Sequence, residues 1–252
     1  MSHLAQIRPR RATEIIDASF GLYRARFGDL LVVSVLLLVP TVLVMQLGPY
    51  LPSWLAFVIM LAANLMYLAG QGAIAVLVAA TLEQGEAISA GTVFRRLGRR
   101  SIAVILVAIA SALLMMIGFV FLVIPFFIAL AWTATSIPAA AIEGLSAGAA
   151  ITRSRELARG RMGHILVTLI LVWLIFVALG FGFMIAFTVA VATLGLSSSP
   201  IILLLVQLLL VPVFPLTGIV TTMLYYDLRV RADGADVAAM IDALPATPAP
   251  SA

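Results

Sequence analysis

The distribution of charge constrains this chain more than any other feature. All of its charged residues, 15 basic and 11 acidic, fall into four clusters, and the three stretches between the clusters carry no charge. The clusters are residues 8–29, 83–100, 143–161 and 227–242. The uncharged stretches are residues 30–82, 101–142 and 162–226. Since one helical crossing of a bilayer takes about 20 apolar residues, each stretch is long enough to cross twice. A chain that enters and returns three times leaves every charge on one side.

Composition supports a membrane location. Hydrophobic residues make up 63% of the chain and charged residues 10%, whereas soluble domains contain roughly 25% charged residues. We therefore expect an all-α, polytopic membrane protein. The basic residues are all arginine, which is typical of a GC-rich bacterial genome. The absence of cysteine excludes disulfides and thiolate chemistry, and no signal peptide is expected at the start.

The three uncharged stretches divide into six predicted transmembrane helices, arranged as three parallel hairpins. Gly-, Pro- and Ser-rich turns at residues 48–53 and 195–200 separate two of the pairs. In the middle stretch the break is placed at Pro125, which lacks a backbone donor and stops a helix. A short re-entrant hairpin is the alternative there. The predicted spans are residues 30–47, 54–82, 102–124, 126–142, 165–194 and 201–226.

The arginines predict the orientation of the chain. All 15 lie on the side opposite the three turns, and cytoplasmic loops carry the excess of arginine and lysine. The reverse orientation would carry the arginine clusters through the membrane, at about 2.5–3.5 kcal/mol for each charge at its centre. Both termini are therefore expected on the cytoplasmic side of a bacterial inner membrane. Residues 1–244 are expected to form one membrane domain, followed by a disordered tail at residues 245–252.

A helical, amphipathic segment is predicted before each hairpin. Such helices usually lie in the membrane interface, with the apolar face toward the lipid and the arginines toward the headgroups. In the first segment the apolar face is formed by Ile16, Phe20, Tyr23 and Phe27. The second and third segments are predicted at residues 89–100 and 146–159.

The entries to the hairpins suggest an internal repeat. An Arg-apolar-Gly triplet stands before the first, third and fifth spans, and a second arginine precedes each triplet. The triplets begin at Arg26, Arg96 and Arg161, and the preceding arginines are Arg24, Arg95 and Arg159. We interpret this pattern as three tandem units related by an axis along the membrane normal. Chance recurrence in a chain whose basic residues are all arginine is the alternative.

Few residues within the predicted spans can carry chemistry. The spans contain no charged residue, which removes the usual starting point for an ion or proton pathway. Asn64 and Gln71 are seven residues apart and share one helix face, and Gln207 lies midway along the sixth span. These side chains could contact a substrate in a hydrophilic lumen. Hydrogen bonding between helices is the commoner role.

Other features predict packing rather than catalysis. Pro138, Pro212 and Pro215 are expected to kink their helices, and His164 has no acidic partner nearby in the sequence, so a structural role is expected. Small residues in the fifth span predict close approach of another helix: Ala178, Gly180, Gly182 and Ala186. The sequence contains no recognisable nucleophile–base set, metal-ligand cluster or phosphate loop. We therefore expect no enzyme activity, no metal and no cofactor.

Residues 138–162 carry a recognisable motif: a proline, then Glu-Gly, then Ala-x-x-Arg-Ser-x-x-Leu-x-x-Gly. Its members include Pro138, Glu143, Gly144, Ser154, Leu157 and Gly160. The motif resembles a widespread group of bacterial membrane proteins, the membrane domain of glycerophosphoryl diester phosphodiesterase and related domains of unknown function. Residues 8–28 and 226–236 are similar to the beginning and end of that group. One departure is Met162-Gly163-His164, where the group often has an aromatic residue.

The resemblance does not imply hydrolysis. Members that hydrolyse glycerophosphodiesters carry a separate soluble domain with a His-Arg pair and metal-binding acids, and no such domain is expected after residue 226 here. The resemblance thus implies a membrane domain without catalytic residues of its own.

The arginines at the membrane boundary are the candidate binding residues. They could bind lipid headgroups, with Arg159 and Arg161 clamping one phosphate, or form a salt-bridged belt that includes Glu143. The headgroup candidates are Arg95, Arg96, Arg99, Arg100, Arg153, Arg159 and Arg161. The expected function is lipid-associated transport or sensing of an amphiphile, and the alternative is a scaffold for a membrane protein partner. An intramembrane enzyme is the third and weakest reading. Anionic lipids are the expected partners, and nucleic acid is not.

Overall fold

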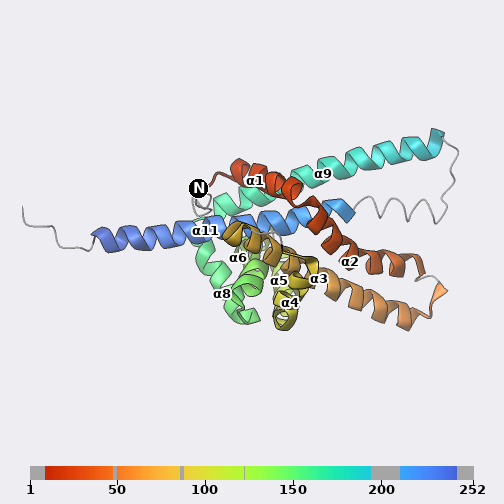
Figure 1. The fold of residues 1–252 in the computed structure, drawn as a ribbon, viewed down its shortest axis with the longest axis horizontal. Coiled ribbons are helices and arrows are strands. Elements are labelled where there is room, and N and C mark those ends of the chain that lie inside the picture. The colour runs from red at the N-terminus through yellow and green to blue at the C-terminus, as the bar shows by residue number, and fades with distance from the viewer. Residues whose placement is uncertain (1–8, 48–49, 86–87, 122, 194–210, 243–252) are drawn as a thin grey trace, which may run out of the picture.

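The computed structural model describes residues 9–47, 50–85, 88–121, 123–193 and 211–242, and every regular element among them is a helix (Figure 1). The prediction of an all-α chain is confirmed. The elements are α1 (Ala12–Ala25), α2 (Phe27–Leu47), α3 (Ser53–Gln84), α4 (Ala90–Leu97), η3 (Gly98–Arg100), α5 (Ser101–Val120), α6 (Val123–Thr133), α7 (Ser136–Glu143), α8 (Ala147–Ala158), α9 (Met162–Thr193), η4 (Val211–Val213) and α11 (Pro215–Asp242).

Four helical stretches are long and apolar enough to cross a membrane. They are Ser53–Glu83, Ser101–Val120, Val123–Glu143 and Met162–Thr193. Their outer faces expose large apolar side chains, such as Phe119 at 73%, Trp173 at 62% and Phe181 at 66%. Contiguous apolar surface of this kind is rare on soluble monomers. The fold is that of a membrane-embedded protein. The apolar part of α2, Phe27–Val39, is shorter, and residues 201–210 of the predicted sixth span lie outside the described residues.

Helix α3 forms the centre of the fold. It packs against α2, α5, α7 and α11, and 61% of its apolar segment is buried, compared with 17% for α9. Residues 71–80 of α3 are all buried. Gly218 lets α11 approach α3 closely, because a Cβ atom there would lie only 2.8 Å from Ile74 Cγ2. Small residues at such crossings are typical of membrane helix packing.

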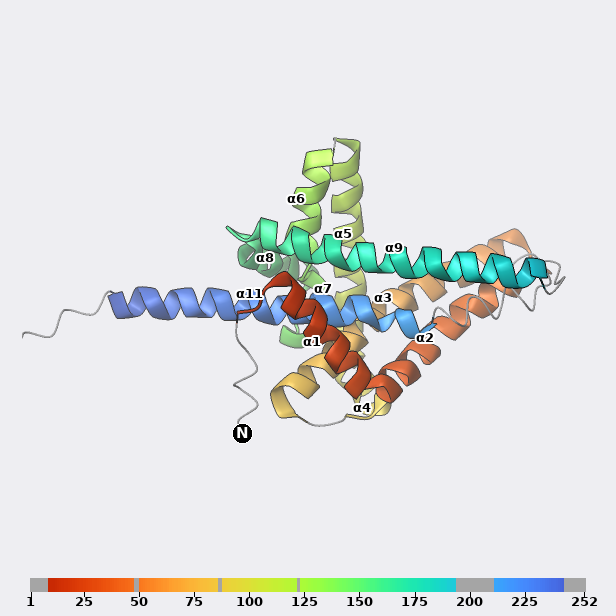
Figure 2. The ribbon, with the colours of Figure 1, turned by 90° about the horizontal axis from the view of Figure 1, so that it is seen from above.

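The middle hairpin differs from its prediction in two respects. The chain turns between α5, which ends at Val120, and α6, which begins at Val123, so the break precedes Pro125. Pro125 lies in the first turn of α6, where its missing N–H costs nothing. In addition, the α5–α6 hairpin leaves the bundle in a different direction from α3 and α9 (Figure 2). Three parallel hairpins are thus not confirmed, since crossing directions depend on side-chain packing that hydropathy does not specify.

Helices α1, α4 and α8 occupy the places of the predicted amphipathic segments, before α2, α5 and α9. The apolar side of α1 packs on α9 and α11 rather than lying open to lipid. Ile15 and Ile16 are buried there, whereas Phe27 of the predicted face is 43% exposed and starts α2. The predicted face was therefore partly wrong, because the side of α1 that meets the protein is centred on Ile15 and Ser19.

The prolines near the end of the chain lie where α11 begins, and the residues before position 211 are outside the described part of the chain. Pro215 is the first residue of α11, a position that suits proline because that N–H would be unpaired anyway. Pro212 lies in η4, and its carbonyl oxygen accepts a hydrogen bond from the Tyr23 hydroxyl at 2.8 Å. Burial raises the pKa of Tyr23 above its ordinary value.

The fourth predicted span consists of two helices joined at a buried break. α6 ends at Thr133, and α7 begins at Ser136 with Pro138 in its first turn. Ser154 of α8 bonds the backbone at this break. Its Oγ accepts a hydrogen bond from the Thr135 N–H at 3.2 Å and lies 2.9 Å from Thr135 Oγ1. Irregular backbone at membrane depth is tolerated where protein satisfies it in this way.

We expect Ser154→Ala to lower the free energy of unfolding by about 2 kcal/mol, because it leaves the buried Thr135 N–H without its acceptor. Thermal unfolding in detergent would measure the change. Ser146→Ala is the matched control, since Ser146 stands at the N-cap of α8 but its side chain makes no capping bond. Its effect should stay within about 0.5 kcal/mol. Equal losses in the two variants would contradict this role for Ser154.

Candidate functional site

Three consecutive residues of α11 hold the ends of three other helices. The Tyr225 hydroxyl donates to Glu143 at the end of α7, and the Tyr226 hydroxyl donates to Glu83 of α3 at 2.5 Å. Asp227 bonds His164 in the first turn of α9. Successive residues of a helix point about 100° apart, so neighbours in sequence can reach different helices. We refer to one group of side chains as the polar cluster: Tyr225, Tyr226, Asp227, Glu83, Glu143, His164 and Arg231.

The acidic members of the polar cluster repeat along the chain. Glu83, Glu143 and Asp227 are each the first residue after the second, fourth and sixth predicted spans. All three lie where a hairpin returns to the charged end of its helices. This regularity is visible in the charge pattern, although Glu83 and Asp227 were not among the candidate residues.

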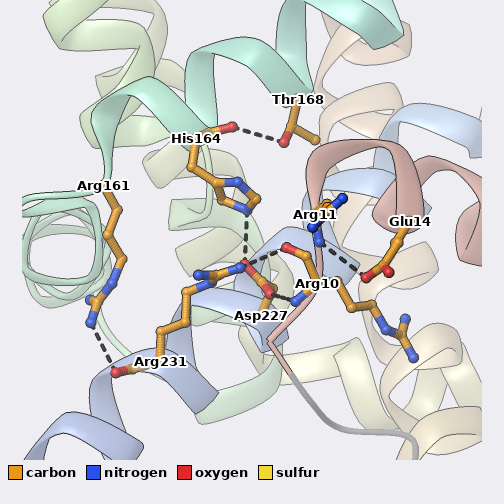
Figure 3. Close-up of polar contacts among 8 residues, drawn as sticks. All are labelled: Arg10, Arg11, Glu14, Arg161, His164, Thr168, Asp227 and Arg231. Atoms are coloured by element: carbon orange, nitrogen blue, oxygen red, sulfur yellow. Dashed lines mark hydrogen bonds and ion pairs between the residues drawn. The ribbon is translucent and has the colours of Figure 1, made fainter.

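Asp227 is the most buried charge of the polar cluster, with a side chain that is 1% exposed. Its Oδ1 accepts a bond from the Arg10 backbone N–H at 2.5 Å, and its Oδ2 accepts from His164 Nε2 at 2.9 Å and Arg231 Nε at 2.8 Å (Figure 3). A buried carboxylate requires such partners. Asp227 therefore joins the N-terminal segment, α9 and α11. The acidic partner of His164 lies 63 positions further along the chain, beyond what proximity in sequence can reveal.

Arginines at the membrane boundary bond the backbone of other helices. Each of three arginines, before the first, third and fifth predicted spans, donates to a backbone carbonyl at the end of α3, in the last turn of α7 or within α11. In the first and third units it belongs to the Arg-apolar-Gly triplet, but in the second it is Arg100 rather than Arg96. The acceptors of Arg26 and Arg100 lie at the ends of α3 and α7, where carbonyls carry partial negative charge that attracts cations, whereas the acceptor of Arg161 lies within α11. The bonds are Arg26 to Gly85 O at 3.5 Å, Arg100 to Ala141 O and Ile142 O at 2.9 Å each, and Arg161 to Arg231 O at 2.9 Å.

The remaining headgroup candidates differ in their surroundings. Arg153 pairs with Glu143 at 3.5 Å, which agrees with the predicted belt. Arg95 and Arg159 are exposed. The side chain of Arg99 lies outside the described residues. Arg96 lines a cavity, described below.

The polar residues predicted within the membrane are not brought together. Asn64 is exposed and donates to the Met60 carbonyl oxygen of its own helix at 2.8 Å. Gln71 is buried beside α11, where a Cβ atom on Gly218 would lie 3.0 Å from its Oε1. Gln207 lies outside the described residues. Neither Asn64 nor Gln71 lines the cavity described below, so the structure offers no support for a polar lumen at these positions.

The residues of the recognised motif shape the segment from α7 to α9. Gly144 is the C-cap of α7 with a φ of 71°, and Gly160 turns the chain toward α9 with a φ of 70°. Both conformations favour glycine. Leu157 is 1% exposed and belongs to the core. By contrast, nothing among the described residues lies within 4 Å of a Cβ placed on Gly180 or Gly182, so the predicted close packing there is not observed.

A cavity of about 300 Å³ lies at the charged end of α3, between α3, α4, η3 and α7. Its walls combine apolar and charged side chains: Val76, Ala79, Ala80, Glu83, Arg96, Arg100, Ala141 and Ile142. Within the described part of the chain, no group of three or more His, Asp or Glu side chains could hold a metal ion.

The fold and the polar cluster together define a helical, membrane-embedded protein. Its charged side chains join the ends of apolar helices. The chain matches no protein-family model, no curated protein and no solved structure. The resemblance to the membrane domain of glycerophosphoryl diester phosphodiesterase therefore stays a proposal that rests on the sequence likeness of residues 8–28, 138–162 and 226–236.

Proposed function

We propose that the chain is a non-enzymatic, multi-pass protein of a bacterial cytoplasmic membrane, and that it associates with anionic lipids through its arginines. The observation that carries the proposal is the junction of long, lipid-exposed apolar helices with a cluster of arginines at their ends. Each arginine near an anionic membrane surface contributes about 1 kcal/mol of attraction. Sensing or organising lipids is favoured over transport, since Asn64 and Gln71 do not line the cavity.

Six crossings with cytoplasmic termini are part of this proposal, and the absence of cysteine makes them testable. Single cysteines at Leu51, Phe121 and Ser198 are expected to react with a membrane-impermeant maleimide in intact spheroplasts. Cysteines at Ser89 and Ser146 are expected to react only after lysis. Labelling of Phe121→Cys only after lysis would instead identify the middle hairpin as re-entrant. Labelling of Ser89→Cys before lysis would contradict the orientation.

Lipid association is tested by mass spectrometry of the purified full chain. Phosphatidylglycerol is expected to remain bound in preference to phosphatidylcholine, because only the former carries a net negative charge. Equal retention of both lipids, or retention of neither, would contradict the proposal.

A scaffold for a membrane protein partner is the second candidate, and one observation favours it. α11 continues to Asp242 and projects beyond the rest of the bundle (Figure 1). A photo-crosslinking residue at position 237 of the full chain would test this role in cells. A discrete crosslinked partner, lost when residues 233–242 are replaced by a Gly/Ser segment, would favour the scaffold over the lipid-associated role.

A further inference from the structure

The cavity at the end of α3 has two kinds of wall. Val76, Ala79 and Ala80 form an apolar wall on α3, and Glu83 continues the same helix into the polar cluster. Val76 and Glu83 are seven residues apart, which corresponds to about 10 Å along a helix. The cavity therefore extends from the charged end of the bundle into its apolar part. A ligand that fills it must itself be polar at one end and apolar at the other.

Among the residues that the structure describes, the charged side chains that line the cavity are two arginines and one glutamate. Arg100 is held in place because its Nη1 donates to the carbonyl oxygens of Ala141 and Ile142, and its Nε and Nη2 carry further N–H donors. Arg96 lies on the neighbouring turn, and Glu83 Oε1 accepts the Tyr226 hydroxyl. Together these two guanidinium groups and one carboxylate contribute a single net positive charge to the described lining of the cavity. Guanidinium groups suit phosphate because their N–H donors match its oxygens.

We propose that this cavity binds the headgroup of an amphiphile that contains a phosphodiester. The phosphate lies between Arg96 and Arg100, and the start of the apolar tail lies along Val76, Ala79 and Ala80. A phosphodiester carries one negative charge, which matches the cavity, whereas a phosphate monoester carries about −1.5 to −2 and would face the Glu83 carboxylate. The inference deepens the proposed lipid association and rests on it.

The size of the cavity agrees with this ligand. Small-molecule sites span roughly 300–1,000 Å³, so a cavity of about 300 Å³ accommodates a headgroup but not a complete lipid. The acyl chains would continue along the exposed apolar surface of the helices. Free phosphate would leave the apolar wall without a partner, and the apolar wall therefore favours an amphiphile.

The test is a titration of the purified full chain, in neutral detergent, with short-chain phosphatidylglycerol, followed by native mass spectrometry. Arg96→Gln is expected to weaken binding about tenfold, since one hydrogen bond to a charged group is lost. Arg95→Gln is the matched control, because it removes the same charge from the adjacent residue, which does not line the cavity. Its effect should be less than about twofold. Equal weakening in both variants would indicate diffuse attraction and overturn the site.

A second variant leaves every charge in place. Ala79→Leu adds volume to the apolar wall, and it is expected to weaken phosphatidylglycerol binding about tenfold while the unfolding temperature stays near that of the wild type. Unchanged affinity in Ala79→Leu would overturn the proposal, as would displacement of the lipid by equimolar inorganic phosphate. Wild-type protein that binds no phosphatidylglycerol would instead overturn the proposed function itself, so the two failures are distinguishable.

Discussion

Replacing Asp227 with alanine is expected to lower the free energy of unfolding by about 3 kcal/mol, the largest effect of any single side chain in the polar cluster. The variant removes the acceptor of the Arg10 N–H, His164 and Arg231 at once. These donors would remain near a buried site without their counter-charge. Unfolding in detergent, followed by circular dichroism, would measure the change. The stability of Asp227→Asn should lie between those of the wild type and Asp227→Ala, because asparagine keeps an acceptor oxygen but loses the charge.

The control for Asp227 is an acidic residue whose own side chain is much more exposed. Asp29 lies 4.0 Å from Arg26, and its side chain is 36% exposed. Surface ion pairs of this kind contribute little, so Asp29→Ala should change stability by less than about 0.5 kcal/mol. If Asp227→Ala behaved like Asp29→Ala, the polar cluster would not hold the helix ends together.

Replacing Gly118 with alanine is expected to cost about 2 kcal/mol, because it forces α5 and α6 apart. A Cβ atom at Gly118 would lie 2.8 Å from the Pro125 carbonyl oxygen and 2.9 Å from the Phe126 Cα. These are backbone atoms, which cannot move aside as a flexible side chain can, and overpacking typically costs 1–3 kcal/mol. The same unfolding measurement applies.

Gly21→Ala is the matched control for Gly118 and should have the opposite sign. Gly21 lies within α1, with nothing within 4 Å of a Cβ placed there. Alanine in a helix interior is favoured over glycine by about 0.5–1 kcal/mol, so this variant should be slightly more stable than the wild type. Stabilisation by Gly118→Ala as well would mean that α5 and α6 do not approach as closely as described.

The Gly144 C-cap and the Ser154 bond show why some features were predictable and others were not. Gly144 follows a helical segment directly, and its conformation depends on residues within one turn, so local sequence was sufficient. Ser154 bonds a break that lies 19 residues earlier, and the need for it appears only when α8 packs against α6 and α7. The triplet repeat pointed to Arg96, but the base of the second hairpin is closed by Arg100, whose reach depends on the geometry of η3.

The residues of the candidate site were likewise predictable only in part. Arg96 and Arg100 were candidates from their position at a membrane boundary, and both line the cavity. Glu83 and the other α3 residues that line the cavity were not candidates, because no local sequence pattern shows that the end of α3 lies beside the end of α7. Asn64 and Gln71, selected because they share a face, point to different surroundings once α11 covers only Gln71.

By itself, the sequence determined that this is an all-helical protein with membrane-length apolar segments, because buried charge is so costly that its distribution marks the boundaries of such segments. It also placed the arginines at the ends of those segments. Only the tertiary structure decided that Asp227 meets His164, that a cavity lies beside Arg96 and Arg100, and that the middle hairpin leaves in its own direction. These features arise from side-chain packing between residues far apart in the chain, which periodicity and charge do not specify.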